Sequence, residues 1–158
     1  MLGRSATVRC RMDVFSRTFL PAAAEAGVPI ATVSRHLPIL RRCVEADDAT
    51  VLVARASSES SPSGDFLVLL TNRRLVVTRE SRVLHRLQLH LNANLRHLSH
   101  VTWATDPRDS HVEVCATAVD GVRERFRLRV AGADHARHLE TRLTHVFSER
   151  RRNVSLAA

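Results

Sequence analysis

The spacing of apolar residues changes near residue 48, and this change limits the fold more than any other feature of the chain. Up to that point apolar side chains recur every three or four residues, as in Val8, Met12, Phe15 and Phe19, which predicts helices. Beyond it, apolar residues alternate with polar ones or form short runs, which predicts β-strands. The chain has 158 residues, about the length of one domain. We therefore expect an α+β fold.

Three segments follow from this division. They are an N-terminal helical extension over 1–47, a β-rich domain over 48–149 and a basic flexible tail over 150–158. Within the extension, Pro21 favours the first turn of a helix, Gly27 favours a helix end and Pro38 interrupts a helix. The expected helices cover 8–19, 22–26, 31–36 and 39–46.

The β-rich domain is expected to hold seven short strands and one closing helix. The run Phe66–Leu70 is apolar throughout, as in a strand that is buried on both faces or closed into a barrel. Asp120-Gly121 is a strong hairpin signal, and an apolar stripe marks a last helix from about 133 to 148. Trp103 is expected in the core. The expected strands cover 50–56, 66–70, 75–78, 83–91, 98–105, 111–119 and 122–130.

The segment Phe66-Leu-Val-Leu-Leu-Thr-Asn-Arg-Arg-Leu-Val-Val-Thr78 resembles a hairpin of bacterial pleckstrin-homology-like (PH-like) and GRAM-like domains. The order of elements over 48–147 is similar as well. The resemblance implies a PH-like antiparallel β-barrel, or two bent sheets of about seven strands, capped by a C-terminal helix. Such domains bind proteins or phosphoinositides, so the fold alone does not set the function. Members that bind phosphoinositides carry basic residues on the first two strands and the loop between them. This chain has only Arg55 there, which argues against a phosphoinositide headgroup.

Four alternating arginines form the sharpest candidate site. Successive side chains of a strand point to opposite faces, so one face of the strand expected at 122–130 carries a set that we call the arginine row: Arg123, Arg125, Arg127 and Arg129. The row predicts a surface for an anionic partner. That partner is foremost a protein, and the alternatives are nucleic acid or an anionic lipid surface bound without specificity. The other interpretation is an ordinary solvated face whose arginines pair with acids such as Glu113.

Two further observations bear on this surface. Arg82 and Arg86 share one face of the strand expected at 83–91 with His90, and they would extend the arginine row. All 24 basic residues are arginine, and the net charge is +8. This composition either reflects the base composition of the genome or favours paired contacts to phosphate and carboxylate groups.

A second candidate lies in residues 23–37, Ala-Ala-Glu-Ala-Gly-Val-Pro-Ile-Ala-Thr-Val-Ser-Arg-His-Leu, which resemble the helix-turn-helix of Lac-repressor-type regulators. The resemblance implies a small DNA-binding transcriptional regulator that places Thr32, Ser34 and Arg35 near the DNA. The sequence departs from the family at Pro29, where the family has a small capping residue. The alternative is a helical segment that packs on the β-rich domain.

The sequence carries no motif of a catalytic or metal site. Nucleophile-elbow and phosphate-binding glycine motifs are missing, and the histidines lack the acidic or thiolate companions of a zinc site. The widely spaced Cys10, Cys43 and Cys115 fit buried or free thiols of a reducing cytoplasm. We therefore expect a cytoplasmic, non-enzymatic PH-like interaction or adaptor module without catalytic residues, metal or cofactor. The alternative is the DNA-binding regulator.

Overall fold

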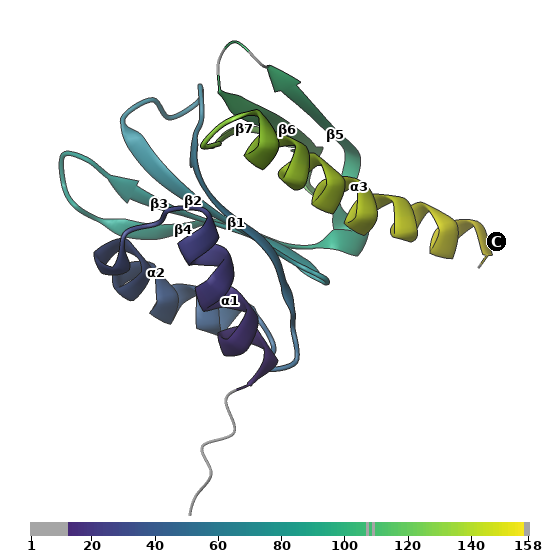
Figure 1. Ribbon diagram of the computed structural model, residues 1–158, viewed down its shortest axis with the longest axis horizontal. Helices are drawn as coiled ribbons and strands as arrows, with labels where there is room; N and C mark the ends of the chain where they lie inside the picture. Colours follow the sequence, from purple (N-terminus) through teal and green to yellow (C-terminus); the bar gives the residue numbers. More distant parts are fainter. Residues whose placement is uncertain (1–12, 107, 109, 157–158) are drawn as a thin grey trace, which may run out of the picture.

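The computed structural model describes residues 13–106, 108 and 110–156, with side chains as far as residue 148. Figure 1 shows two N-terminal helices, seven strands and a long C-terminal helix, which confirms the α+β class. The helices are α1 (Val14–Glu25), α2 (Ile30–Cys43), the short 3-10 helix η1 (Leu95–His97) and α3 (Ala133–Leu156). The strands are β1 (Thr50–Ser57), β2 (Gly64–Thr71), β3 (Arg74–Ser81), β4 (Leu87–Asn94), β5 (Ser99–Asp106), β6 (His111–Thr117) and β7 (Arg123–Arg129).

All seven strands belong to one open antiparallel sheet, in the order β4-β3-β2-β1-β7-β6-β5. Strand β1 joins the two halves of the sheet. It pairs along most of its length with β2, but with β7 only through Ala56 and Ser57. The halves bend toward each other, because side chains of both reach one core. The ring of Phe66 on β2 lies 5.8 Å from the ring of Phe126 on β7, measured between centroids.

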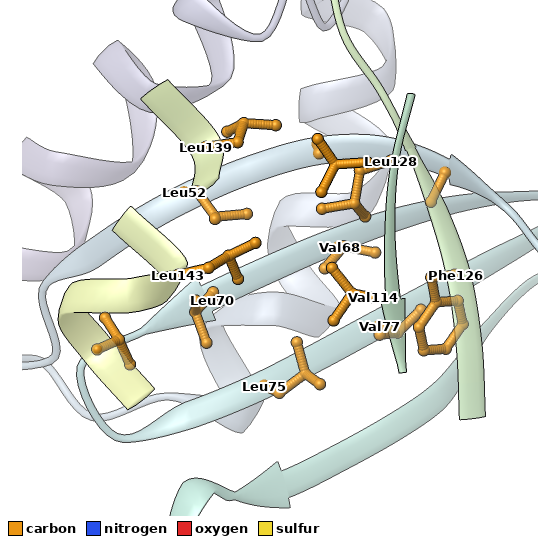
Figure 2. Packing of buried hydrophobic residues seen from close by; sticks show 14 of the residues in the cluster. Leu52, Val68, Leu70, Leu75, Val77, Val114, Phe126, Leu128, Leu139 and Leu143 are labelled. Atoms are coloured by element: carbon orange, nitrogen blue, oxygen red, sulfur yellow. The ribbon is translucent and has the colours of Figure 1, made fainter. Parts of the chain in front are cut away.

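The main core lies between the two halves of the sheet and α3. Figure 2 shows apolar side chains of β1, β2, β3, β6 and β7 pointing toward one another and toward Leu139 and Leu143 of α3. Burial of one side chain of this size contributes roughly 1.5–3 kcal/mol, so the apolar stripe of α3 stabilises the bend. Trp103 packs at the edge of this core and stacks on Phe147 at 5.8 Å, as expected.

A second core lies on the opposite face of β1, β2 and β3, beneath α1 and α2. Leu67 and Leu69 of β2 point into it and pack with Phe19 of α1 and Leu40 of α2. Their neighbours in the strand point into the main core. Strand β2 is therefore buried on both faces, which explains why Phe66–Leu70 contains no polar residue. The N-terminal helices are packed on the sheet through this core.

The expected helix breaks at Pro21 and Pro38 are wrong. Both prolines lie inside continuous helices, α1 and α2. A proline inside a helix removes one backbone hydrogen bond and crowds the preceding turn. Here the turns before and after each proline bury side chains in the same core, as Phe19 and Ala22 do around Pro21. Tertiary packing outweighs the local cost. The expected helical residues 8–12 lie outside the described residues.

Gly27 ends α1 as expected. Its φ of +67° lies in the left-handed region that favours glycine. The amide of Gly27 donates to the carbonyl of Ala24, and the amide of Val28 donates to the carbonyl of Ala23, so the last carbonyls of α1 are satisfied. The chain then turns directly into α2, and α1 and α2 cover neighbouring parts of the sheet (Figure 1).

The two largest differences from the predicted element boundaries are at the start of β4 and at the end of α3. Residues 82–86 form a turn rather than the start of a strand, and β4 begins at Leu87. The positive φ of His85, 47°, belongs to this turn. Helix α3 continues to Leu156, through most of the segment expected to be a flexible tail. Apolar periodicity alone did not mark either boundary, because turns and helix ends depend on hydrogen bonds that the pattern does not contain.

Candidate binding face

The structure places the arginine row on the outer face of β7. Phe126 and Leu128 are buried in the main core, and the four arginines between and beside them point the other way. Arg123, Arg125 and Arg129 are exposed, and Arg127 is half-buried. Strand β7 lies between β6 and β1; β6 flanks the whole row, and β1 reaches it only at Arg127 and Leu128.

The two middle arginines are paired with carboxylates. Arg127 forms an ion pair with Glu59 of the β1–β2 loop, and its Nε lies 3.8 Å from Glu113 of β6. The Nε of Arg125 lies 3.7 Å from the other oxygen of Glu113. Hydrogen bonding to Cys115 and the charge of Glu113 raise the pKa of Arg125. The centre of the row is thus largely compensated, as the interpretation of a solvated face expects.

The two end arginines keep uncompensated charge. Arg123 donates to the carbonyl of His100 at 3.0 Å and to the hydroxyls of Thr117 at 3.1 Å and Thr102 at 3.4 Å, all neutral groups. The side chain of Arg129 makes no ion pair or hydrogen bond within the described part of the chain. The two are six positions apart in the sequence, which corresponds to about 20 Å along a strand. The face therefore presents uncompensated positive charge at its two ends. Its centre is mixed, because arginines and carboxylates lie there side by side.

Arg82 and Arg86 do not continue the row. Both belong to the turn between β3 and β4, and β1 and β2 separate β3 from β7 in the sheet. Arg82 pairs with Asp65 at 3.0 Å. His90 points inward instead: its ring lies 5.2 Å from the ring of Phe66, and its Nε2 lies 3.3 Å from a carboxylate oxygen of Glu124. An irregularity in the pairing of β3 with β4 at this point turns His90 toward the core.

The helix-turn-helix segment lies against the sheet. Within α2, Val33 is buried and Leu37 is half-buried in the second core. Arg35 reaches the sheet and pairs with Glu80 of β3 at 3.1 Å. Thr32 is half-buried, and Ser34 is exposed. Of the three residues expected near DNA, only Ser34 points fully to solvent without a partner in the described residues.

His36 anchors α2 to β3. Its Nδ1 lies 2.7 Å from the hydroxyl of Thr78, and its Nε2 lies 3.5 Å from Glu80. These partners assign the proton to Nε2, so that Nδ1 accepts from the Thr78 hydroxyl. Burial lowers the pKa of His36, against the opposing charge of Glu80. The lowered pKa favours the neutral ring over the protonated ring in the folded protein.

A small polar pocket adjoins this anchor, and sequence reasoning missed it. It encloses about 70 Å³ between α2 and the outer face of β1, β2 and β3. Its polar lining is Thr32, Arg35, His36, Arg55, Asp65 and Glu80. These residues come from α2, β1, β2 and β3, and no local sequence pattern connects them. The sequence analysis had singled out Arg55, through the PH-like resemblance, and Thr32 and Arg35, as candidate DNA contacts, but for other reasons.

Among the described residues, no cluster of three or more His, Cys, Asp or Glu side chains offers a metal site. None of the described helices is long and apolar enough to cross a membrane. Cys43 and Cys115 are free and buried, and Cys10 lies outside the described residues. Comparison with protein-family models, curated proteins and solved structures finds no match to this chain.

Proposed function

We propose that this chain is a non-enzymatic interaction module that binds an acidic segment of a partner protein on the arginine row. The observation that carries the proposal is the row itself. Four arginines share the outer face of β7, and the two at its ends have no acidic partner in the described residues. The opposite face of β7 is buried in the main core, and this packing holds the arginine row on a rigid strand.

The mixed centre of the row favours a protein over a nucleic acid. Glu59 and Glu113 stand beside Arg125 and Arg127, and a uniformly charged phosphate backbone would meet these carboxylates. An extended peptide can instead place acidic side chains opposite the two ends and neutral or basic side chains opposite the centre. The matching segment carries two acidic groups about 20 Å apart.

We also propose that the fold is PH-like and that the protein is cytoplasmic. The strand order, the bend of the sheet and the helix that follows the last strand support a PH-like fold whose two halves close around the main core. The free, buried thiols of Cys43 and Cys115 support a cytoplasmic location. Neither point depends on the identity of the partner.

The alternative function, DNA binding through residues 23–37, has less support. A recognition helix needs its reading face exposed in the major groove. Arg35 is held by Glu80 on the sheet, and Thr32 is half-buried beside it. To read DNA, α2 would have to give up this ion pair and the packing of Val33. Arg35→Ala removes duplex binding if this alternative is correct and leaves it unchanged if it is not.

The proposed function is tested by peptide binding with charge-matched variants. The probe is a fluorescent peptide that carries two glutamate clusters about 20 Å apart around a neutral centre. It is compared with a single-stranded oligonucleotide of equal charge, and the readout is fluorescence anisotropy at low salt. In the variant Arg123→Gln/Arg129→Gln, peptide affinity should fall roughly three- to tenfold, the sum of two surface charge interactions. The control, Arg17→Gln/Arg42→Gln, removes the same charge from exposed positions of α1 and α2.

The control should bind the peptide as the wild type does. Equal losses in both variants would show that only net charge matters, and the site would be wrong. Tighter binding of the oligonucleotide than of the peptide would contradict the choice of a protein partner. Affinity capture from the source cells with the same three proteins then identifies the partner, as the component that the row variant alone fails to retain.

A further inference from the structure

The turn between β3 and β4 exposes two neighbouring aliphatic side chains. Val83 and Leu84 are 79% and 68% exposed. Single apolar residues on a surface are common, but an adjacent pair at the tip of a hairpin is a concentrated apolar surface. The turn lies at the left edge of the molecule in Figure 1, apart from α3 and the row on β7. In the isolated chain, nothing in the described residues covers this pair.

Basic residues frame the pair. Arg82 precedes it, and His85 and Arg86 follow it. Asp65 pairs with Arg82 and compensates its charge, whereas the side chain of Arg86 is exposed and makes no ion pair within the described residues. The turn therefore combines an apolar tip with a basic flank. Cationic side chains beside an exposed apolar group are the arrangement that binds the headgroup region of an anionic bilayer.

The neighbouring end of α2 adds to the same surface. Arg35 and His36 contact Glu80 and Thr78 near the end of β3, so the start of α2 lies at the end of the sheet that carries the turn. Ile30, the first residue of α2, is 84% exposed. The exposed apolar groups at this end are therefore the pair at the hairpin tip and the first side chain of α2. Exposed aliphatic side chains beside basic residues can enter the interface of a fluid bilayer.

We propose that the β3–β4 turn docks the protein on an anionic lipid bilayer by inserting Val83 and Leu84 between the headgroups, with Arg86 at the charged surface. This membrane contact is separate from the arginine row and from the hairpin positions at which PH-like domains hold phosphoinositides. The lipid recognised is any anionic bilayer surface rather than one headgroup, because the described residues of the turn form no enclosed pocket. Binding thus needs both negative charge and an apolar interface.

Vesicle sedimentation of the full chain tests the proposal. The probes are vesicles of phosphatidylcholine with phosphatidylserine and vesicles of phosphatidylcholine alone. The wild type should sediment with the first and not with the second, and added salt should weaken the binding. Leu84→Ser should lower the partition coefficient about tenfold, because an aliphatic side chain is no longer buried. Arg86→Gln should lower it by a smaller factor.

Matched controls come from α1 and α2. Leu20→Ser removes another exposed leucine, 48% exposed, and Arg42→Gln removes another exposed arginine; both should bind vesicles as the wild type does. All these side chains are exposed, so circular dichroism and the unfolding midpoint should not change. The proposal is overturned if the wild type ignores phosphatidylserine vesicles, or if Leu84→Ser binds like Leu20→Ser. It is also overturned if Arg123→Gln/Arg129→Gln, and not Leu84→Ser, removes vesicle binding.

Discussion

The contact between His36 and Thr78 offers the sharpest test of how α2 is held on the sheet. Thr78→Val keeps the shape of a side chain that is 0% exposed and removes its hydroxyl. The Nδ1 of His36, in a ring that is 2% exposed, then loses its hydrogen-bond donor. A buried polar atom left without a partner costs about 1–3 kcal/mol. We expect the free energy of unfolding to fall by that amount.

Urea unfolding at pH 7.5, followed by circular dichroism, measures this change. Thr32→Val is the control, because Thr32 is half-buried and its hydroxyl has no partner in the described residues; its effect should stay within about 0.5 kcal/mol. The hydrogen bond itself is isolated by a double-mutant cycle with His36→Phe. In the His36→Phe background, Thr78→Val should cost little, since no acceptor is left unpaired. An equal cost in both backgrounds would refute the assignment, as would an effect of Thr78→Val no larger than that of the control.

Three further predictions concern pH, backbone and core. Burial lowers the pKa of His36 below its ordinary 6.5, so the unfolded chain protonates first as pH falls below about 6.5, and the free energy of unfolding falls with it; His36→Phe should remove this part of the pH dependence in urea titrations. Gly27→Ala, at φ +67°, should lower the free energy of unfolding by about 1–2 kcal/mol. Leu143→Ala, in the main core, should lower it by about 2–5 kcal/mol. Thermal scans showing no shift for either substitution would contradict the packing described.

The periodicity of the chain predicted most of the secondary structure. Alternation was sufficient to predict β6 and β7, and the apolar run was sufficient to predict β2. A strand buried on one or two faces must carry apolar residues on those faces. The same reasoning failed at residues 83–86. Val83 and His85 continue the alternation of the following strand, but they lie in a turn. The pattern describes which faces are apolar, and it does not require that an apolar residue be buried.

The helix breaks predicted at the two prolines were wrong for a different reason. Pro21 and Pro38 each carry a local penalty, which the sequence shows. The packing of Phe19 and Leu40 against the sheet offsets that penalty, and this packing involves residues of β1, β2 and β3 that local reasoning does not connect to the helices. A helix in a folded protein is stabilised mainly by its buried face rather than by its intrinsic propensity.

By itself, the sequence determined the shared face of Arg123, Arg125, Arg127 and Arg129, because that face follows from the geometry of any strand. The tertiary structure decided which of these arginines remain uncompensated. Glu59 lies 68 positions from Arg127, and only the pairing of β1 with β7 brings the β1–β2 loop to the row. The tertiary structure likewise placed Arg35 against Glu80 and left Val83 and Leu84 exposed. Charge and periodicity are local properties of a chain, whereas neutralisation and exposure depend on which distant segments fold against it.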